Sequence, residues 1–313
     1  MPARDETSAN RPPLNWRGAG WITGAAMALY VAFRFLPTGT NLHHLDFRVD
    51  GSGGLEMCDP SRPQFIPVVA ARSPVLVKLE RSGQPEANTL TLTLSTAGGK
   101  PIGPEDLLTV HTRKLHLLAV DETLADYQHL HPEPGERAGE WRFTHVPAHG
   151  GVYRVFADFT PAATGRGLYA FSDYIAPGAA GGPVSARIEM KPVWTARRGD
   201  WEFTIVPGGA GGGIRAGQPT TLGFAVRAIK GGEPVPLELV MDAYAHLVAF
   251  DVGRTGFAHL HPRSEDQGKV PDPRRPELNF DLMIPQPGRY VIWAQVQLAG
   301  EPVFVPFWFE VQP

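Results

Sequence analysis

Residues 115–132, LHLLAVDETLADYQHLHP, and residues 245–262, AHLVAFDVGRTGFAHLHP, are two copies of one pattern in a chain of 313 residues. In both copies the second histidine follows the first by 13 residues, and the third follows the first by 15. Self-similarity at fixed spacing is the signature of an internal repeat. We therefore expect the chain to contain the same structural unit twice.

The likeness between the copies extends well beyond the histidines. Upstream, residues 99–102 (GKPI) correspond to residues 232–235 (GEPV), and downstream, residues 151–156 (GVYRVF) correspond to residues 288–293 (GRYVIW). The glycine-rich stretch GAAGG at residues 178–182 resembles a flexible junction between two such units. These observations predict a first repeat over residues 46–180 and a second over residues 181–313.

The composition favours strands over helices. Residues 89–94 (TLTLTL) alternate strictly between polar and apolar side chains, which is the period of a half-buried strand. The 35 glycines and 31 prolines are scattered, so they break the chain into many short segments. Repeats of about 130 residues with many short strands are typical of immunoglobulin-like sandwiches. The predicted fold is all-β, with two tandem immunoglobulin-like β-sandwich domains after an N-terminal transmembrane helix.

The transmembrane prediction rests on residues 18–36, GAGWITGAAMALYVAFRFL, which carry a single charge, Arg34, over 19 residues. That length is sufficient to span a bilayer. The arginines before it favour a cytoplasmic tail over residues 1–17, and residues 37–45 then form a linker. A cleaved signal peptide is the alternative. This interpretation places the protein in the inner membrane as a single-pass protein, with both repeats in the periplasm.

Charge and cysteine content exclude several classes of function. The net charge is −3 and no long run of one sign occurs, so nothing indicates binding to nucleic acid. The single cysteine, Cys58, cannot form an intrachain disulfide. We interpret it as a buried, inert thiol, and the alternative is a soft metal ligand beside Met57.

The repeated histidines are predicted to lie on one face of a hairpin. In a strand, residues i and i+2 point to the same face, so His129 and His131 share a face, as do their counterparts in the second copy. A symmetric hairpin pairs residues i and 247−i in the first copy and residues i and 507−i in the second. His116 then lies opposite His131 and diagonal to His129. The apolar residues of the other face, such as Leu117 and Leu130, would form the core.

Three neutral imidazoles on one face suit Zn(II) or Cu(II). The predicted ligands are His116, His129, His131, His246, His259 and His261. The alternative is that these histidines brace the hairpins through hydrogen bonds. Asp158 and Gln295 occupy corresponding places in the two copies, as do Tyr153 and Tyr290, and we assign none of them as a fourth ligand.

The remaining histidines are expected to lie on the surface or in the linker. His43 and His44 fall in the predicted linker, where an accessory metal site is the alternative. His111, His145 and His149 occur only in the first copy, where they could enlarge its site.

The pattern of both copies resembles a group of largely uncharacterised bacterial secreted or membrane-anchored proteins with a recurring GHL…HxHP signature. Residues 56–60 (EMCDP) and 63–68 (PQFIPV) are similar to stretches of such chains, and the resemblance covers residues 46–313. It implies periplasmic proteins that handle metal, with copper the metal usually inferred. The chain departs from the signature in having Leu115 and Ala245, instead of glycine, before the leading histidines.

These features favour a non-catalytic, membrane-anchored metal-binding protein for sequestration or delivery. Its partners would be the metal ion, the membrane and an envelope protein of unknown identity. An immunoglobulin-like interaction module with structural histidines is the alternative. A metal-dependent enzyme is a third hypothesis, but Glu133 of one copy is Arg263 in the other, so no shared general base is found. No catalytic or cofactor-binding residue is therefore assigned.

Overall fold

The computed structural model describes residues 16–34, 42–47, 64–81, 88–178, 192–208, 212–266 and 269–313. The chain divides into two compact units, Met1–Asn41 and Leu42–Pro313, which are considered separately. Several sequence predictions lie outside the described residues: those for Met57 and Cys58, and the junction at residues 179–182.

The first unit contributes one helix, α1 (Trp16–Arg34). Within the described residues, no helix is long and apolar enough to cross a membrane. The predicted anchor over residues 18–36 and the inner-membrane location derived from it are therefore wrong. The physical reason is composition: glycine and alanine make up much of α1 and add little apolar surface, and the helix includes both Arg17 and Arg34.

The first half of the second unit contains two four-stranded sheets, preceded by the short helix η1 (His44–Phe47). One sheet has the order β1-β2-β6-β5, and the other has the order β4-β3-β7-β8. The elements are β1 (Val75–Arg81), β2 (Thr89–Thr96), η2 (Pro104–Asp106), β3 (Leu115–Asp121), β4 (Tyr127–Leu130), β5 (Glu133–Pro134), β6 (Glu140–Thr144), β7 (Gly151–Phe159) and β8 (Leu168–Ala176).

The second half repeats this arrangement. Its sheets have the orders β16-β12-β10-β9 and β11-β18-β17-β14-β15, with β13 paired to β17. The order β15-β14-β17-β18 matches β4-β3-β7-β8, so the internal repeat extends to topology. The strands are β9 (Thr195–Arg198), β10 (Trp201–Pro207), β11 (Ile214–Arg215), β12 (Thr220–Ala228), β13 (Leu237–Glu238), β14 (His246–Asp251), β15 (Phe257–Leu260), β16 (Glu277–Leu282), β17 (Gly288–Leu298) and β18 (Glu301–Gln312).

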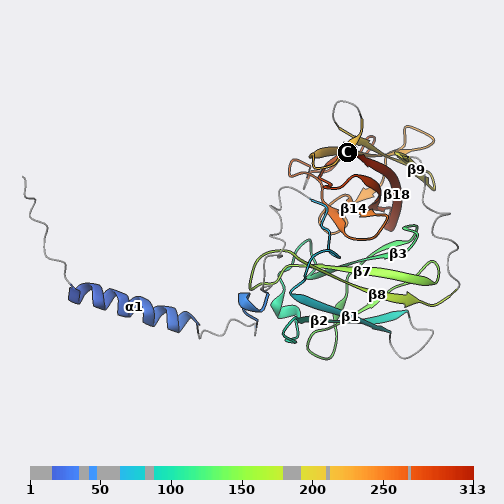
Figure 1. The fold of residues 1–313 in the computed structure, drawn as a ribbon. Helices are drawn as coiled ribbons and strands as arrows, with labels where there is room; N and C mark the ends of the chain where they lie inside the picture. Colours follow the sequence, from blue (N-terminus) through green and yellow to red (C-terminus); the bar gives the residue numbers. More distant parts are fainter. Residues whose placement is uncertain are drawn as a thin grey trace, which may run out of the picture. The chain divides into compact units, whose positions relative to one another are not determined.

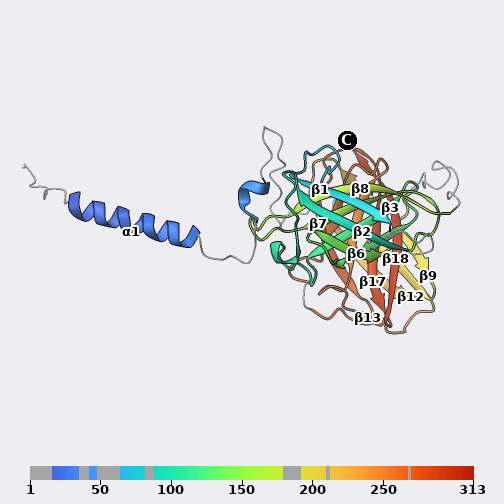
Figure 2. The same ribbon diagram turned by 90° about the horizontal axis from the view of Figure 1, so that it is seen from below.

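Each half buries its own core between its two sheets, so each half is a β-sandwich. In the first half, Leu92 and Trp141 of one sheet pack with Leu117 and Val155 of the other. Strand β2, which contains the alternating TLTLTL, buries every second side chain, as its pattern predicts. Figure 2 shows β1 and β2 lying across the sheet that contains β7 and β8. The mostly-β fold class is therefore confirmed.

The two halves lie side by side in Figure 1, and a third core joins them. Phe156 of the first half contacts Phe250 and Phe257 of the second, with ring centroids 6.0 Å and 5.2 Å away. Strand β3 is consequently buried along its whole length, on both faces. The histidine-bearing sheets of the two halves therefore face each other, and the histidine faces lie inside the molecule.

A short segment before β1 also ties the halves together. The backbone N–H of Ile66 donates to the carbonyl of Phe257, 2.8 Å away, so this segment runs beside β15 of the second half. Gly256 permits the approach, because a Cβ there would lie 1.8 Å from the carbonyl oxygen of Ile66. The first half has Asp126 at the corresponding position.

Candidate metal centre

The register of both histidine hairpins agrees with the sequence prediction. Leu117 pairs with Leu130 in the first half, and Leu247 pairs with Leu260 in the second. These pairs fit the predicted sums of 247 and 507. The leucines lie in the sandwich cores, so the histidines lie on the opposite face, toward the other half.

An aspartate at the end of the first strand fixes each hairpin loop. The carboxylate of Asp121 accepts hydrogen bonds from the backbone N–H groups of Thr123, Ala125 and Asp126. Asp251 organises the second loop through the corresponding N–H groups. The backbone N–H groups of a turn need hydrogen-bond acceptors, and the aspartate supplies them in both loops. These bonds stabilise one loop conformation of fixed length, and the loop length sets the register of the histidines.

The leading histidine of each half is anchored by a backbone carbonyl. Nε2 of His116 lies 3.0 Å from the carbonyl oxygen of Val110, and Nε2 of His246 lies 2.9 Å from that of Val240. A carbonyl can only accept, so each Nε2 carries the proton and donates it. Nδ1 of both rings is consequently left with a free lone pair.

The middle histidine of each half is anchored by the other half. Nδ1 of His129 lies 2.9 Å from Oε1 of Gln295, and Nδ1 of His259 lies 3.1 Å from Oδ2 of Asp158. Each ring donates from Nδ1, so its Nε2 keeps a lone pair. Asp158 and Gln295 are themselves the strand partners of the leading histidines His116 and His246. The two acceptors are therefore equivalent in position and different in charge.

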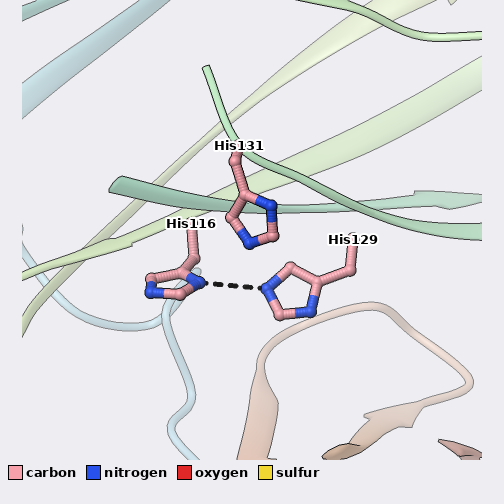
Figure 3. Close-up of side chains that lie close together, drawn as sticks. All are labelled: His116, His129 and His131. Carbon is pink, nitrogen blue, oxygen red and sulfur yellow. Dashed lines mark hydrogen bonds between the residues drawn. The ribbon is translucent and has the colours of Figure 1, made fainter. Parts of the chain in front are cut away.

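The lone pairs converge within each half. Figure 3 shows His116, His129 and His131 pointing toward one another, with Nδ1 of His116 3.1 Å from Nε2 of His129. Both of these atoms carry lone pairs by the argument above. Two nitrogens bound to one tetrahedral ion at about 2.0–2.1 Å lie about 3.3 Å apart, so the spacing suits shared coordination. In each triad, one ligand atom per histidine lies within 4.8 Å of the others, and each triad could hold a metal ion.

Several of these nitrogens are buried without a partner. Among the described residues, no hydrogen bond reaches Nε2 of His131, His259 or His261, or Nδ1 of His246. A buried polar atom without a partner costs about 1–3 kcal/mol, and native proteins contain few of them. These four nitrogens, all in the two triads, are therefore available to bind a ligand.

Burial keeps the imidazoles neutral. Desolvation, followed by the neighbouring histidines, lowers the pKa of His131 to about 3, and desolvation lowers the pKa of His246 to about 4. The same causes hold the pKa of His129, His259 and His261 well below the usual value. Neutral imidazole is the form that binds a metal, so protons do not compete for these nitrogens at neutral pH.

The two triads adjoin across the interface between the halves. The ring of His259 lies 5.1 Å from that of His129 and 5.7 Å from that of His116, measured between centroids. These distances match those within a triad, where the rings of His116 and His131 are 5.1 Å apart. The six predicted ligands therefore form one continuous cluster, a relationship that was absent from the sequence prediction.

A seventh histidine, His111, joins the cluster from the first half. Its ring stacks on that of His261 of the second half, with centroids 3.7 Å apart. His111 lies in a turn with a positive φ of 48°, and Met241 occupies the same place in the second half with a φ of 50°. The expectation of a surface position for His111 is thus wrong. A sequence signal existed, because both residues stand five positions before the leading histidine.

The other histidines lie outside the cluster. His145, expected on the surface, is 1% exposed and contacts Tyr174, because the β7–β8 sheet covers it. His149 lies 2.9 Å from the carboxylate of Asp121 and is largely buried. The rings of His43 and His44 contact each other at a tilt of 44°, with centroids 4.0 Å apart. Tyr153 donates to Asp126, so it is not directed at the histidine triads.

Comparison with known proteins identifies a family for this chain, but that family has no assigned activity. A family model described as a domain of unknown function (DUF8832) matches residues 73–169 and 204–313, ranges that contain all six predicted ligands. No curated protein matches the chain. The fibronectin(III)-like modules of Clostridium thermocellum CbhA match at 8% identity, covering 76% of this chain and 94% of that one, with a TM-score of 0.18. That score is too low for the likeness to bear on fold or function.

Proposed function

The chain belongs to the family of this domain of unknown function, and we propose that it binds Cu(II) or Zn(II) through one three-histidine site in each half. The ligand atoms are Nδ1 of the leading histidine and Nε2 of the two histidines of each HxH pair. The function is metal sequestration or delivery. The halves are two tandem immunoglobulin-like domains, residues 46–180 and 181–313.

The observation that carries this proposal is the set of unpartnered ring nitrogens. If the histidines only braced the hairpins, both nitrogens of each ring would be expected to bond to backbone or side-chain groups. Instead, the leading and middle histidines are each held by one nitrogen, and the other nitrogen points into the cluster. A ring oriented by a bond to its second nitrogen is the arrangement found in histidine metal ligands.

The donor set limits the choice of metal. Imidazole nitrogens suit Zn(II) and Cu(II), whereas Cu(I) prefers sulfur ligands. In the described part of the chain, the sulfur nearest in sequence to either motif is that of Met241, in the turn before His246. The two triads alone thus favour a divalent ion.

Metal titration of the full chain without a histidine tag tests the proposal. We expect about two ions per chain for Cu(II) or Zn(II), and about one ion in each of the variants His129→Ala/His131→Ala and His259→Ala/His261→Ala. The variant His43→Ala/His44→Ala removes the same number of imidazoles elsewhere and should keep both ions.

The alternative, bracing by structural histidines, gives a different result. Wild-type chain would then bind neither ion above micromolar affinity, and both triad variants would lose thermal stability without any change in metal content.

A further inference from the structure

The rings of the two triads contact each other. Three ring pairs connect them: His129 with His259 at 5.1 Å, His116 with His259 at 5.7 Å and His129 with His246 at 6.1 Å. A metal lies only about 2 Å from its ligand nitrogen. Two ions held by rings in mutual contact would therefore be neighbours, as the ions of two-metal sites are.

The six ligands nevertheless divide into two groups of three, so one ion cannot satisfy all of them. The compact groups are His116, His129 and His131 on one side and His246, His259 and His261 on the other. Each group has its own anchored leading histidine and its own HxH pair. The geometry thus provides two adjacent positions within a single cluster.

The halves also depend on each other for ligand orientation. Gln295 of the second half holds His129, and Asp158 of the first half holds His259. Neither triad keeps the orientation of its middle ring if the interface between the halves opens. Each site therefore exists only in the docked pair of halves.

Two divalent cations held by buried rings repel each other strongly, because the surroundings screen charge poorly. Asp158 supplies one carboxylate, and its side chain is 18% exposed. A small anion between the ions would offset the repulsion. The rings of His131 and His261 are partly exposed although their Nε2 atoms are buried, so solvent borders the cluster at these two residues.

Building on the proposed metal-binding function, we propose that the two triads hold their ions as one dinuclear centre, bridged by a solvent-derived hydroxide. The bridge forms when a water molecule bound between the ions releases one proton to solvent, and no oxidation or reduction is involved.

Electron paramagnetic resonance of the full chain loaded with Cu(II) tests this inference, with metal content measured on the same samples. Two Cu(II) ions joined by a bridge couple their spins. We expect the signal of the doubly loaded chain to fall well below the summed signals of the His129→Ala/His131→Ala and His259→Ala/His261→Ala variants.

Wild-type chain loaded with one Cu(II) and one Zn(II) is the matched reference, because zinc carries no spin and no residue is changed. It should show the full signal of one isolated copper ion. Chain loaded with Co(II), which substitutes for zinc, provides the same comparison by magnetic susceptibility if copper does not bind.

The outcomes separate the two proposals. Two bound ions whose signals simply add would overturn the dinuclear centre and leave the metal-binding function intact. A single ion per chain would replace the centre with one shared site. Absence of binding by Cu(II), Zn(II) and Co(II) would overturn both.

Discussion

The two triads share one scaffold but differ in the groups that support it. In both, a turn carbonyl anchors the leading histidine and a residue of the opposite half anchors the middle one. The acceptor is neutral Gln295 for the first triad and the carboxyl of Asp158 for the second. The comparison shows that a duplicated fold can keep the same histidines in both copies while the groups that anchor them differ in charge.

Both triads consist of buried histidines with lowered pKa, so the stability of the chain should fall in acid. The pKa of each buried triad histidine is lowered in the folded chain, mainly by desolvation, while an unfolded histidine titrates near pH 6.5. Below about pH 6.5 the unfolded chain therefore binds protons that the folded chain does not. Each such histidine reduces the free energy of unfolding by about 1.4 kcal/mol per pH unit, down to its folded pKa.

We expect the metal-free chain to lose stability steeply from about pH 6.5 toward pH 4, measured by denaturant unfolding at a series of pH values. Desolvation raises the pKa of Asp158 to about 6, so this group acts in the opposite direction and offsets part of the loss. A variant lacking either HxH pair should show a shallower slope by a similar amount. A slope that changes in only one of the two variants would show that the triads are not equally buried.

Gly256→Ala should destabilise the contact between the segment before β1 and strand β15 of the second half. The added Cβ would meet the carbonyl oxygen of Ile66, a backbone atom that cannot move aside easily. We expect a loss of about 3 kcal/mol, at the upper end for overpacking, in thermal or denaturant unfolding. Gly213→Ala is the control in the second half, because a Cβ added there meets no atom within 4 Å and the backbone φ is not positive. Equal losses in the two variants would argue against the close approach.

Asp158→Asn should make the two triads more alike. Asparagine can still accept the hydrogen bond from His259 but lacks the charge that increases the basicity of the ring. We expect the affinity of the second site to fall about tenfold, measured by competition with a chelator of known affinity. An unchanged affinity would mean that the charge of Asp158 does not act on this site.

Gln295→Glu is the reciprocal change and should have the smallest effect. It gives His129 a carboxylate acceptor in place of an amide, which should tighten the first site. The gain should be less than tenfold, because Gln295 is only 6% exposed and burying its charged replacement has a cost. The same chelator competition measures it. If Gln295→Glu binds the metal more weakly than wild type does, a carboxylate at this position does not strengthen the first site.

The sequence was sufficient to predict the hairpins and not their packing. Equal loops between Asp121 and Tyr127 and between Asp251 and Phe257 made the register predictable from spacing alone. No regular spacing in the sequence indicates which residues of the two halves contact each other. A signal was nevertheless present in LHLLAVD of β3, which is apolar on both faces, as strands buried on two sides are.

The roles of Asp158 and Gln295 also required coordinates. Their correspondence was visible in the sequence, but each lies opposite a leading histidine of its own half and bonds to a middle histidine of the other half. These hydrogen bonds between the halves form only because the two histidine-bearing sheets pack against each other. The membrane prediction was wrong for a simpler reason, since it relied on the length of an uncharged stretch more than on its apolar content.

Anomalous diffraction from crystals of the full chain loaded with Cu(II) or Zn(II) tests the central claim most directly. The account predicts two peaks within the histidine cluster. One is bound by Nδ1 of His116 with Nε2 of His129 and His131, and the other by Nδ1 of His246 with Nε2 of His259 and His261. Peaks at other residues, or a cluster without metal whose ring nitrogens bond to protein groups, would contradict it.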